Sequence, residues 1–321
     1  MPGTEKLCCV AITGASGLIG RALSTRLRSG GHTVLPLQRN NSGSSWNVAT
    51  GEVRTPSPIS ALIHLAGRNV AVRWTRRHRD EIWRSRVTAT EKLAAFLAHL
   101  PPDQRPHTLI SASAIGVYGD RGDDLLNEES APAPEGRSFL ADVCRAWEAA
   151  TRPAQNAGIR VVHARLGVVL SRHGGALARL LTPTKFGLGG PIGSGRQFLS
   201  WISLHDTAEM LAAMLRDPTL RGPVNVVAGA NRQHAFMRTL GHILHRPVVF
   251  PMPALAVTAF FGRMGQEVLL ASQRVAAIRT PPTFAFTHPT LEAALRWAIA
   301  PPLERHRDSD PANSSPHSPG T

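Results

Sequence analysis

The pattern of apolar and polar positions near the N-terminus predicts a strand, a helix and a second strand. Residues 7–13 (LCCVAIT) form a continuous apolar run, which is typical of a strand buried on both faces of a parallel sheet. Residues 18–27 repeat apolar side chains at helical spacing, and Gly30 and Gly31 follow as a helix-ending signal. Residues 33–37 (TVLPL) are predicted as the next strand. Together these segments predict a βαβ unit.

The alternation of strands and helices continues to about residue 164. Further strands are predicted at residues 60–66, 107–113 and 159–164, and helices at residues 76–99 and 138–152. The Asn-, Ser-, Gly- and Pro-rich residues 40–58 and the polar residues 119–137 are predicted as loops. This order predicts an α/β fold of the Rossmann type, a doubly wound parallel sheet with helices on both faces.

The pattern changes after residue 170. Residues 174–200 are glycine-rich and predicted as irregular, apart from one helical piece around 176–181. A helix at 206–216 and a strand at 224–229 follow, and short helices alternate with Pro-bounded segments over 234–300. We therefore expect a nucleotide-binding domain over residues 1–170, to which 204–229 return. A smaller C-terminal substrate lobe would comprise residues 171–203 and 230–300. The Pro- and Ser-rich residues 301–321 are expected to form a disordered tail.

Charge suggests an anionic partner but does not indicate nucleic acid. The 321 residues include 36 basic and 22 acidic side chains, a net charge of +14. A basic balance of this kind can indicate nucleic acid or an anionic membrane surface. However, nearly all of the basic residues are arginines, and they are scattered without a run of five or six. We therefore favour a compositional drift toward arginine over nucleic-acid binding, with part of the charge serving an anionic cofactor or substrate.

The cysteines and the apolar stretches indicate in which cellular compartment the protein is expected. Cys8, Cys9 and Cys144 cannot all pair and have no metal-binding spacing, so we expect buried thiols in a reducing compartment. The first predicted strand begins too early to leave room for a signal peptide. The longest uncharged stretch, Pro247–Gly262, is short and interrupted by prolines, so it is not predicted to span a membrane. We expect a protein of the cytoplasm or an organellar matrix, with an unidentified small-molecule substrate and no membrane partner. Whether it forms a homodimer is open.

The turn after the first strand carries the strongest chemical signal. It has the form G-x-x-G-x-x-G and stands between an apolar strand and an amphipathic helix. Such a turn brings the backbone close to a pyrophosphate, and the N–H groups of the helix N-terminus favour its negative charge. The turn therefore predicts a dinucleotide-binding site. The residues are Gly14, Ala15, Ser16, Gly17, Leu18, Ile19 and Gly20.

The end of the second predicted strand indicates which nicotinamide cofactor binds. An NAD-specific site places a carboxylate there for the ribose 2′-hydroxyl. This chain instead has Gln38, Arg39 and Asn40, without an acidic residue nearby. Arg39 can pair with a 2′-phosphate, so NADP(H) is the expected cofactor, although an exposed arginine in an arginine-rich chain would look the same.

Several motifs, in order, resemble the extended short-chain dehydrogenases. They are GASGLIG (14–20), IHLAG (63–67), SASAIGVYG (111–119) and RLGVVL (165–170). More specific segments are similar to an atypical branch of this group, the NAD(P)-dependent sugar-nucleotide epimerase family, which includes plant proteins linked to plastid division. These segments are RWTRRHRDEIWRSRV (73–87), GLGGPIGSGRQFLSWI (187–202), GRMGQEVLLASQRV (262–275) and HPTLEAAL (288–295).

The resemblance implies roles for individual residues. The glycine turn would frame the pyrophosphate, and Gln38 and Arg39 would hold the adenosine ribose phosphate. Further cofactor contacts would come from Leu65, Ala66, Gly67, Glu81 and Arg86, with Arg165 and Val169 near the nicotinamide. Gly190, Pro191, Ser194, Gly195 and Gln197 would lie over the substrate cleft.

The catalytic residues of the parent group are largely missing. That group uses Ser, Tyr and Lys, with tyrosine as the acid/base and lysine lowering its pKa. Alignment on Glu148 puts Leu140 and Cys144 in the tyrosine and lysine positions. Ser113 remains in the serine position and is the one catalytic candidate, although a strand-end hydroxyl bonded to backbone is an equal interpretation. The hypotheses are an NADP(H)-dependent oxidoreductase or epimerase with altered acid/base groups and a non-catalytic NADP(H)-binding regulator, for example of organelle or cell division.

Overall fold

A six-stranded parallel sheet forms the centre of the protein. The computed structural model describes residues 8–39, 43–282 and 284–300. The strand order is β11-β8-β6-β5-β1-β2, and every neighbouring pair is parallel. The strands are β1 (Cys9–Thr13), β2 (Thr33–Leu37), β5 (Ala61–His64), β6 (Thr108–Ala114), β8 (Arg160–Leu166) and β11 (Gly222–Val226). The order reverses at β1, and in doubly wound folds the ligand crevice forms at such a point, here at the carboxyl ends of β1 and β5.

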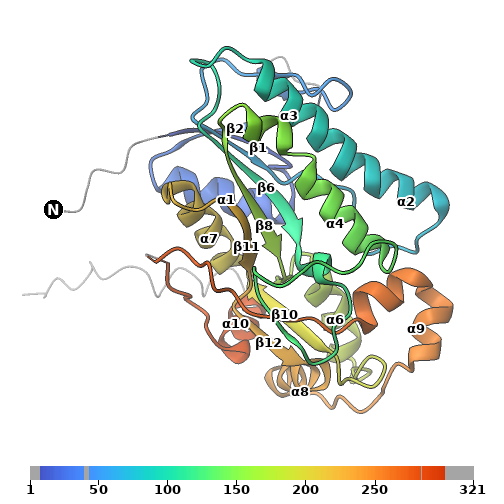
Figure 1. Ribbon diagram of the computed structural model, residues 1–321. Coiled ribbons are helices and arrows are strands. Elements are labelled where there is room, and N and C mark those ends of the chain that lie inside the picture. The colour runs from blue at the N-terminus through green and yellow to red at the C-terminus, as the bar shows by residue number, and fades with distance from the viewer. Residues whose placement is uncertain (1–7, 40–42, 283, 301–321) are drawn as a thin grey trace, which may run out of the picture.

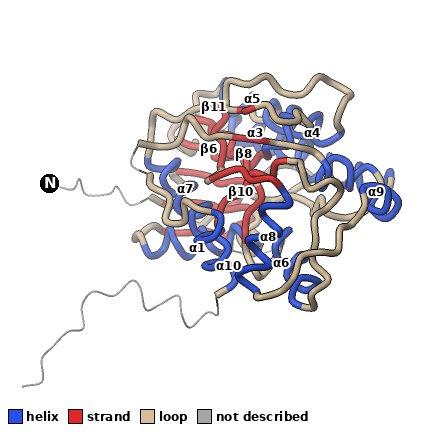
Figure 2. Tube along the Cα trace, turned by 90° about the horizontal axis from the view of Figure 1, so that it is seen from below, coloured by secondary structure: helices blue, strands red, loops and turns tan. Residues whose placement is uncertain are grey.

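Helices cover both faces of this sheet (Figures 1 and 2). On one face α1 (Leu18–Ser29) packs beside α7 (Leu204–Arg216). The opposite face carries α3, α4 and α5, and α2 extends beyond α3. These elements are α2 (Arg76–Trp83), α3 (Ala89–His99), α4 (Phe139–Ala149) and α5 (Arg152–Asn156). The structure is thus the doubly wound Rossmann-type fold that the sequence predicts.

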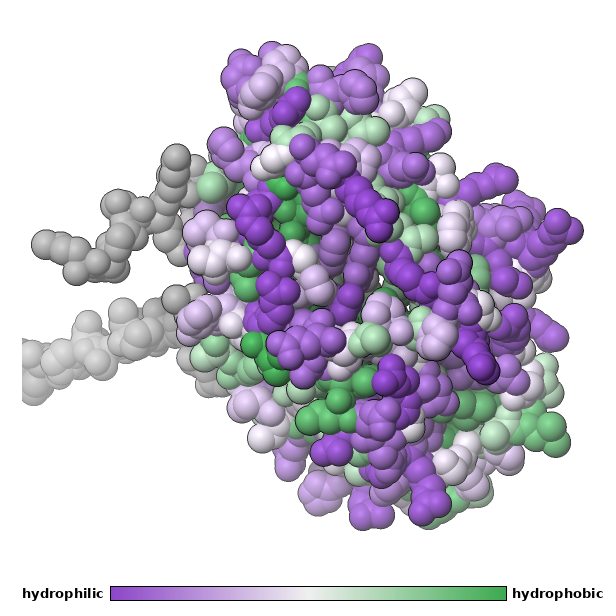
Figure 3. Space-filling view, in the orientation of Figure 1, coloured by the Kyte–Doolittle hydropathy of each residue, from purple (hydrophilic) through white to green (hydrophobic). Residues whose placement is uncertain are grey.

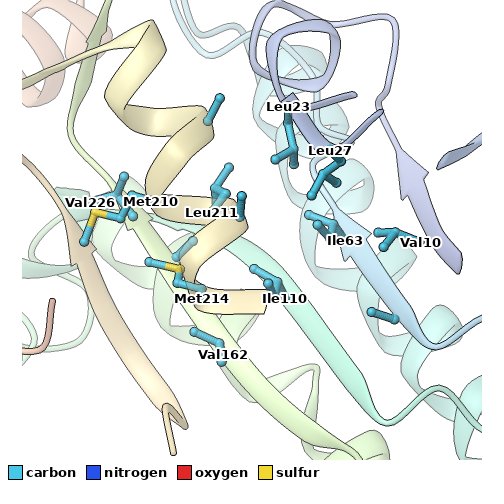
Figure 4. Close-up of a cluster of buried hydrophobic side chains, with 14 of the residues drawn as sticks. Val10, Leu23, Leu27, Ile63, Ile110, Val162, Met210, Leu211, Met214 and Val226 are labelled. Atoms are coloured by element: carbon cyan, nitrogen blue, oxygen red, sulfur yellow. The ribbon is translucent and has the colours of Figure 1, made fainter. Parts of the chain in front are cut away.

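The apolar strands are buried because both of their faces are covered. Figure 4 shows Val10, Ile63, Ile110 and Val162 of the sheet against apolar residues of α1 and α7. The residues next to them in sequence point to the other face, where Leu62 and Leu109 pack against α3. A strand in this position needs apolar residues at consecutive positions, which explains the unbroken apolar runs.

A smaller lobe is built around a second sheet with the order β12-β10-β9. Its strands are β9 (Val168–Leu170), β10 (Phe198–Ser203) and β12 (Gly229–Arg232). Trp201, Phe236 and Leu295 are among the side chains of its own apolar core. The helices are α6 (Gly175–Lys185), α8 (Gln233–Leu244), α9 (Ala254–Phe261) and α10 (Leu291–Ile299), and β13 (Arg274–Val275) pairs with β7 (Leu125–Leu126).

The structure differs from the sequence-based expectation in several places, of which four are the largest. The predicted loop 40–58 contains a short hairpin, β3 (Ser45–Trp46) and β4 (Val53–Arg54), whose Trp46 enters the core. The segment 174–200, predicted as mostly irregular, contains the full helix α6 and the first half of β10. The predicted helix 76–99 is continuous but passes through a π-helical stretch, η1 (Arg84–Thr88). The predicted helix 138–152 ends as α4 before the separate α5 begins.

Two further expectations concern domains and membranes. Segment 204–229 supplies α7 and β11 to the main sheet, while the division of the chain into domains stays a prediction. The predicted disordered tail, 301–321, lies outside the described residues. Among the helices that the structure describes, none has the length and apolar character needed to cross a bilayer.

Candidate functional site

The glycine turn after β1 tolerates no side chain at two of its positions. Gly14 has a φ of +71°, and a Cβ there would stand 2.9 Å from backbone atoms of both Leu65 and Ala66. A Cβ on Gly20 would overlap the Gly14 carbonyl oxygen. Gly17 is the N-cap of α1 and offers no capping side chain. The first N–H groups of α1, which have no acceptor within the helix, therefore lie at an uncovered turn.

The end of β5 lies next to this turn and against a partly buried arginine, Arg86. Leu65 and Ala66 are partly buried, and the Cβ position of Gly67 lies 3.1 Å from Cζ of Arg86. The Arg86 guanidinium lies 5.2 Å from the ring centre of Trp147 on α4. Its Nη1 is buried and has no hydrogen-bond partner among the described residues. Burial lowers the pKa of Arg86, as expected for a cation without a carboxylate partner.

The other predicted cofactor contacts are polar, and they range from exposed to partly buried. Gln38 and Arg39 are exposed at the end of β2, and Arg39 forms no ion pair with a described residue. Glu81 accepts a hydrogen bond from Arg77 at 3.1 Å and lies 3.2 Å from Nε of Arg68. The hydrogen bond from Arg77 and the neighbouring positive charges lower the pKa of Glu81, so it is ionised at neutral pH.

A second group of polar residues is buried at the ends of β6 and β8. Ser113 Oγ donates to Glu148 Oε1 over 2.7 Å. Arg165 donates to both carboxylate oxygens of Glu148, at 2.8 and 2.9 Å, and also to the Tyr118 hydroxyl at 2.9 Å. The Tyr118 hydroxyl in turn donates to Asn225 Oδ1 on β11. Arg165 and Ser113, only 5% and 2% exposed, are therefore joined through one carboxylate.

The charges in this network follow from its geometry. Burial by itself would raise the pKa of Glu148, but the paired guanidinium of Arg165 holds that pKa below its usual value. Glu148 likewise raises the pKa of Arg165 against the opposing effect of burial. Burial raises the pKa of Tyr118, which is therefore neutral. At neutral pH the network consists of an ion pair with two neutral hydroxyls on its two sides.

Leu140 and Cys144 of α4 face η2 (Ile115–Tyr118), which follows β6. The Cβ position of Gly116 lies 3.7 Å from Leu140 Cβ and 3.9 Å from Cys144 Sγ. Burial raises the pKa of the Cys144 thiol to about 12. A thiol with this pKa stays protonated at neutral pH, and Leu140 has no proton to exchange. Neither Leu140 nor Cys144 therefore offers a group that transfers a proton near neutral pH.

The predicted substrate residues are built into the loop between α6 and β10. Pro191 O accepts from Met252 N, and Gly195, with a φ of +67°, packs against His234. The amide of Gln197 donates to the carbonyls of Ile192 and Leu269, so it holds the loop together. The Cβ position of Gly190 would overlap the Phe250 carbonyl, and Ser194 Oγ accepts from Arg196 N.

The structure thus brings the predicted residues together in separate groups. The glycine turn, the end of β5 and Arg86 form one group, and Ser113 and Arg165 form another. The remaining cofactor residue, Val169 on β9, is partly buried against the core beneath α7. Their roles toward a cofactor or substrate stay predictions.

Sequence reasoning missed two features. The first is the role of Glu148 as the shared partner of Ser113 and Arg165. The available signal was a charged residue on the inner face of a predicted amphipathic helix. The second is a cavity of about 250 Å³ between α2 and α4. It is lined by Arg76, Arg79, Asp80, Trp83 and Phe139.

The fold and its glycine turn define a Rossmann-type protein of the short-chain dehydrogenase/reductase group. The chain belongs to the NAD dependent epimerase/dehydratase family, whose family model matches residues 10–229. Residues 252–298 match a second model, a domain of unknown function (DUF1731). The resemblance to an epimerase family predicted from the sequence is therefore confirmed.

Similar proteins come from bacteria, plants and animals. The chain is 41% identical to the epimerase family protein MT2273 of Mycobacterium tuberculosis, over 91% of this chain and 98% of that protein. It is 34% identical to the chloroplastic SDR39U1 homolog of Arabidopsis thaliana, over 92% and 91% of the two chains. A crystal structure of human epimerase family protein SDR39U1 with NADPH is similar, with 32% identity and a TM-score of 0.81. That match covers 90% of this chain and 98% of the human one.

Proposed function

We propose that the protein is an NADP(H)-binding oxidoreductase of the epimerase/dehydratase type. The observation that carries this proposal is the turn Gly14–Gly20, which excludes side chains next to the uncovered N-terminus of α1. Nη1 of Arg86 supplies a second reason, because a buried guanidinium nitrogen without an acceptor among the described residues fits an anionic ligand. The human relative crystallised with NADPH is consistent with this ligand.

Arg39 supports NADP(H) over NAD(H). It is exposed at the carboxyl end of β2, where an NAD-specific site would have a carboxylate. A free guanidinium at that point can form a bidentate contact with a 2′-phosphate. Gln38, beside it, is also exposed and can hydrogen-bond the same ribose.

The residues of the second group limit the chemistry. A bound nicotinamide cofactor supplies hydride transfer, which depends on positioning and electrostatics that the fold provides. The Ser113 hydroxyl donates its hydrogen bond to Glu148, so the lone pairs of its oxygen remain free to accept one. This suits a substrate hydroxyl. The Arg165–Glu148 ion pair fixes Ser113 in this orientation. Ser113 would therefore orient the carbinol of a substrate.

A non-catalytic NADP(H)-binding regulator is the second candidate function. The apolar Leu140 and the protonated thiol of Cys144 favour it, because the alignment puts them at the positions of the acid/base tyrosine and its lysine. A cofactor-binding protein without an acid/base group could still report the NADPH level through its conformation.

Calorimetric titration tests the cofactor. Wild-type protein and the variants Arg39→Ala and Arg28→Ala are each titrated with NADPH and with NADH. The control position, Arg28, is also exposed and lies in the last turn of α1, at the end of the helix away from the glycine turn. We expect wild type and Arg28→Ala to prefer NADPH, and Arg39→Ala to lose that preference. If wild-type protein binds neither nucleotide, the proposal is wrong.

Turnover separates the two candidates. Wild-type protein and Ser113→Ala are incubated with NADPH or NADP⁺ and a broad set of carbonyl and sugar-nucleotide substrates, and nucleotide absorbance is followed. Turnover that disappears in a folded Ser113→Ala variant supports the oxidoreductase. Cofactor binding without turnover of any substrate supports the regulator.

A further inference from the structure

Helix α9 has the composition of a buried helix but lies on the surface. Its eight residues, ALAVTAFF, include no charged side chain. A helix that is apolar on all sides normally lies in a protein core or a membrane. Here Val257 is the one buried residue, while Leu255 is 81% and Phe260 71% exposed. The helix therefore presents apolar side chains that the described part of the chain does not cover.

Two neighbouring segments extend this apolar surface. Residues 185–193 run beside residues 246–252, joined by hydrogen bonds from Phe250 N to Gly189 O and from Met252 N to Pro191 O. The chain enters α9 directly from the second segment, and the Cβ position of Gly193 lies 3.8 Å from Ala254 Cβ. Green surface marks apolar residues over α9 at the lower right of the molecule (Figure 3). The apolar patch, as named from here on, consists of Phe186, Leu188, Val249, Phe250, Leu255 and Phe260, each more than half exposed.

The charges that border the apolar patch are positive. Residues 149–205 and 218–266, which contain both segments and α9, include no aspartate or glutamate. Lys185 directly precedes Phe186, and Arg246 donates a hydrogen bond to the Lys185 carbonyl, so the two cations lie together. Arg263, just after α9, lies 3.3 Å from the Glu267 carboxylate, so Lys185 and Arg246 carry the positive charge of the border. The patch is thus an apolar surface with a basic border.

This combination favours a lipid surface over a second copy of the chain. Two copies meeting through the apolar patch would bring their basic borders together, at an electrostatic cost. An anionic phospholipid surface would instead attract the border and accept the apolar side chains at the headgroup level. Patches of exposed apolar residues with a polar border are typical of such interaction sites.

We propose that the apolar patch docks the protein onto anionic phospholipid membranes, with Leu255 and Phe260 inserted at the interface and Lys185 and Arg246 facing the headgroups. The protein lies on the bilayer and does not cross it. The proposal departs from the sequence-based expectation of no membrane partner, which rested on the absence of a spanning segment.

Vesicle flotation tests the proposal. Full-length protein is mixed with vesicles of phosphatidylcholine alone, and with vesicles of equal parts phosphatidylcholine and phosphatidylglycerol. We expect binding to the anionic vesicles and little to the neutral ones. The double variant Leu255→Ser/Phe260→Ser should bind at least about tenfold more weakly, because it removes the two most exposed large apolar side chains of α9 that would be buried at the interface.

Two further variants isolate the apolar patch and its charge. Leu125→Ser removes an apolar side chain that is 61% exposed on β7, outside the patch, and should bind like wild type. Lys185→Glu should weaken binding to anionic vesicles, and the loss should shrink as salt is added. Circular dichroism of every variant confirms that the fold is retained, since all four changed positions are exposed.

Several results would overturn the proposal. One is absence of binding to phosphatidylglycerol vesicles, and another is a Leu255→Ser/Phe260→Ser variant that binds as tightly as wild type. A third is a wild-type dimer, seen by light scattering, that the same double variant converts to monomer. That outcome would assign the patch to contacts between two copies.

Discussion

His64 predicts a measurable dependence of stability on pH. It lies at the end of β5, fully buried, with Nδ1 2.7 Å from Thr13 Oγ1 and its ring edge-on to Trp46 at 5.2 Å. Its Nε2 has no hydrogen-bond partner among the described residues. Burial, and then the charge of Arg86, lower the pKa of His64 from 6.5 to about 4. The folded protein therefore holds this imidazole neutral.

The sign and size of the effect follow from linkage. Between pH 6.5 and about 4 the unfolded chain binds a proton on His64 that the folded protein does not. The stabilisation is therefore complete above pH 6.5 and is lost as the pH falls toward 4. For these two pKa values the free energy of unfolding drops by about 2 kcal/mol between pH 7 and pH 5.

Urea unfolding at a series of pH values, followed by circular dichroism, measures this drop. The variant His64→Asn keeps a polar atom near Thr13 but does not titrate, so its free energy of unfolding should change by about 2 kcal/mol less than wild type over the same range. His107→Asn, at an exposed position, is the matched control and should follow wild type. If His64→Asn and wild type lose stability in parallel, the reasoning about this buried imidazole is refuted.

Three other predictions concern the turn, a buried cation and the ion pair. Gly20→Ala should weaken NADPH binding at least about tenfold in calorimetry, because the new Cβ would overlap the Gly14 carbonyl. Unchanged affinity would show that the glycine turn does not form the NADPH site. Arg160 donates five hydrogen bonds to four carbonyls in the last turn of α7 and the loop after it. Arg160→Met should therefore lower the free energy of unfolding in urea by about 3 kcal/mol, and a loss well below 1 kcal/mol would contradict this. Glu148→Gln should lower the free energy of unfolding by about 3 kcal/mol at neutral pH, because it leaves Arg165 buried without a counter-ion. Since the pKa of Glu148 is lowered in the folded protein, the stability of the wild-type protein should fall as the pH drops through and below about 4.5. In thermal unfolding, the melting temperature of Glu148→Gln should depend less on pH over this acid range.

The elements that the sequence predicts correctly are those whose environment leaves a local pattern. Strands β1, β5, β6 and β8 are covered on both faces, so each needs an apolar run that is visible without knowledge of its neighbours. The glycine turn is recognisable for a similar reason, since its close backbone contacts require glycine at fixed spacing.

Other features depend on partners that are distant in the sequence. β10 follows a glycine-rich loop, and its pairing with β9 and β12 brings together segments about 30 residues apart on each side. Hairpin β3–β4 has two residues per strand, which is too short for a periodic signal. The Arg165–Glu148 pair joins a strand to a helix, and the local pattern around either residue does not show which charge it meets.

The place of β11 in the main sheet has a consequence for the order of events during synthesis. β11 pairs with β8 along its whole length, and α7 covers Ile110 and Val162 on the same side. A nascent chain that has reached only residue 170 therefore carries an unpaired edge strand and a bare apolar face. The N-terminal half cannot finish folding on the ribosome until residue 226 has emerged, so truncation before that point should yield an aggregating fragment.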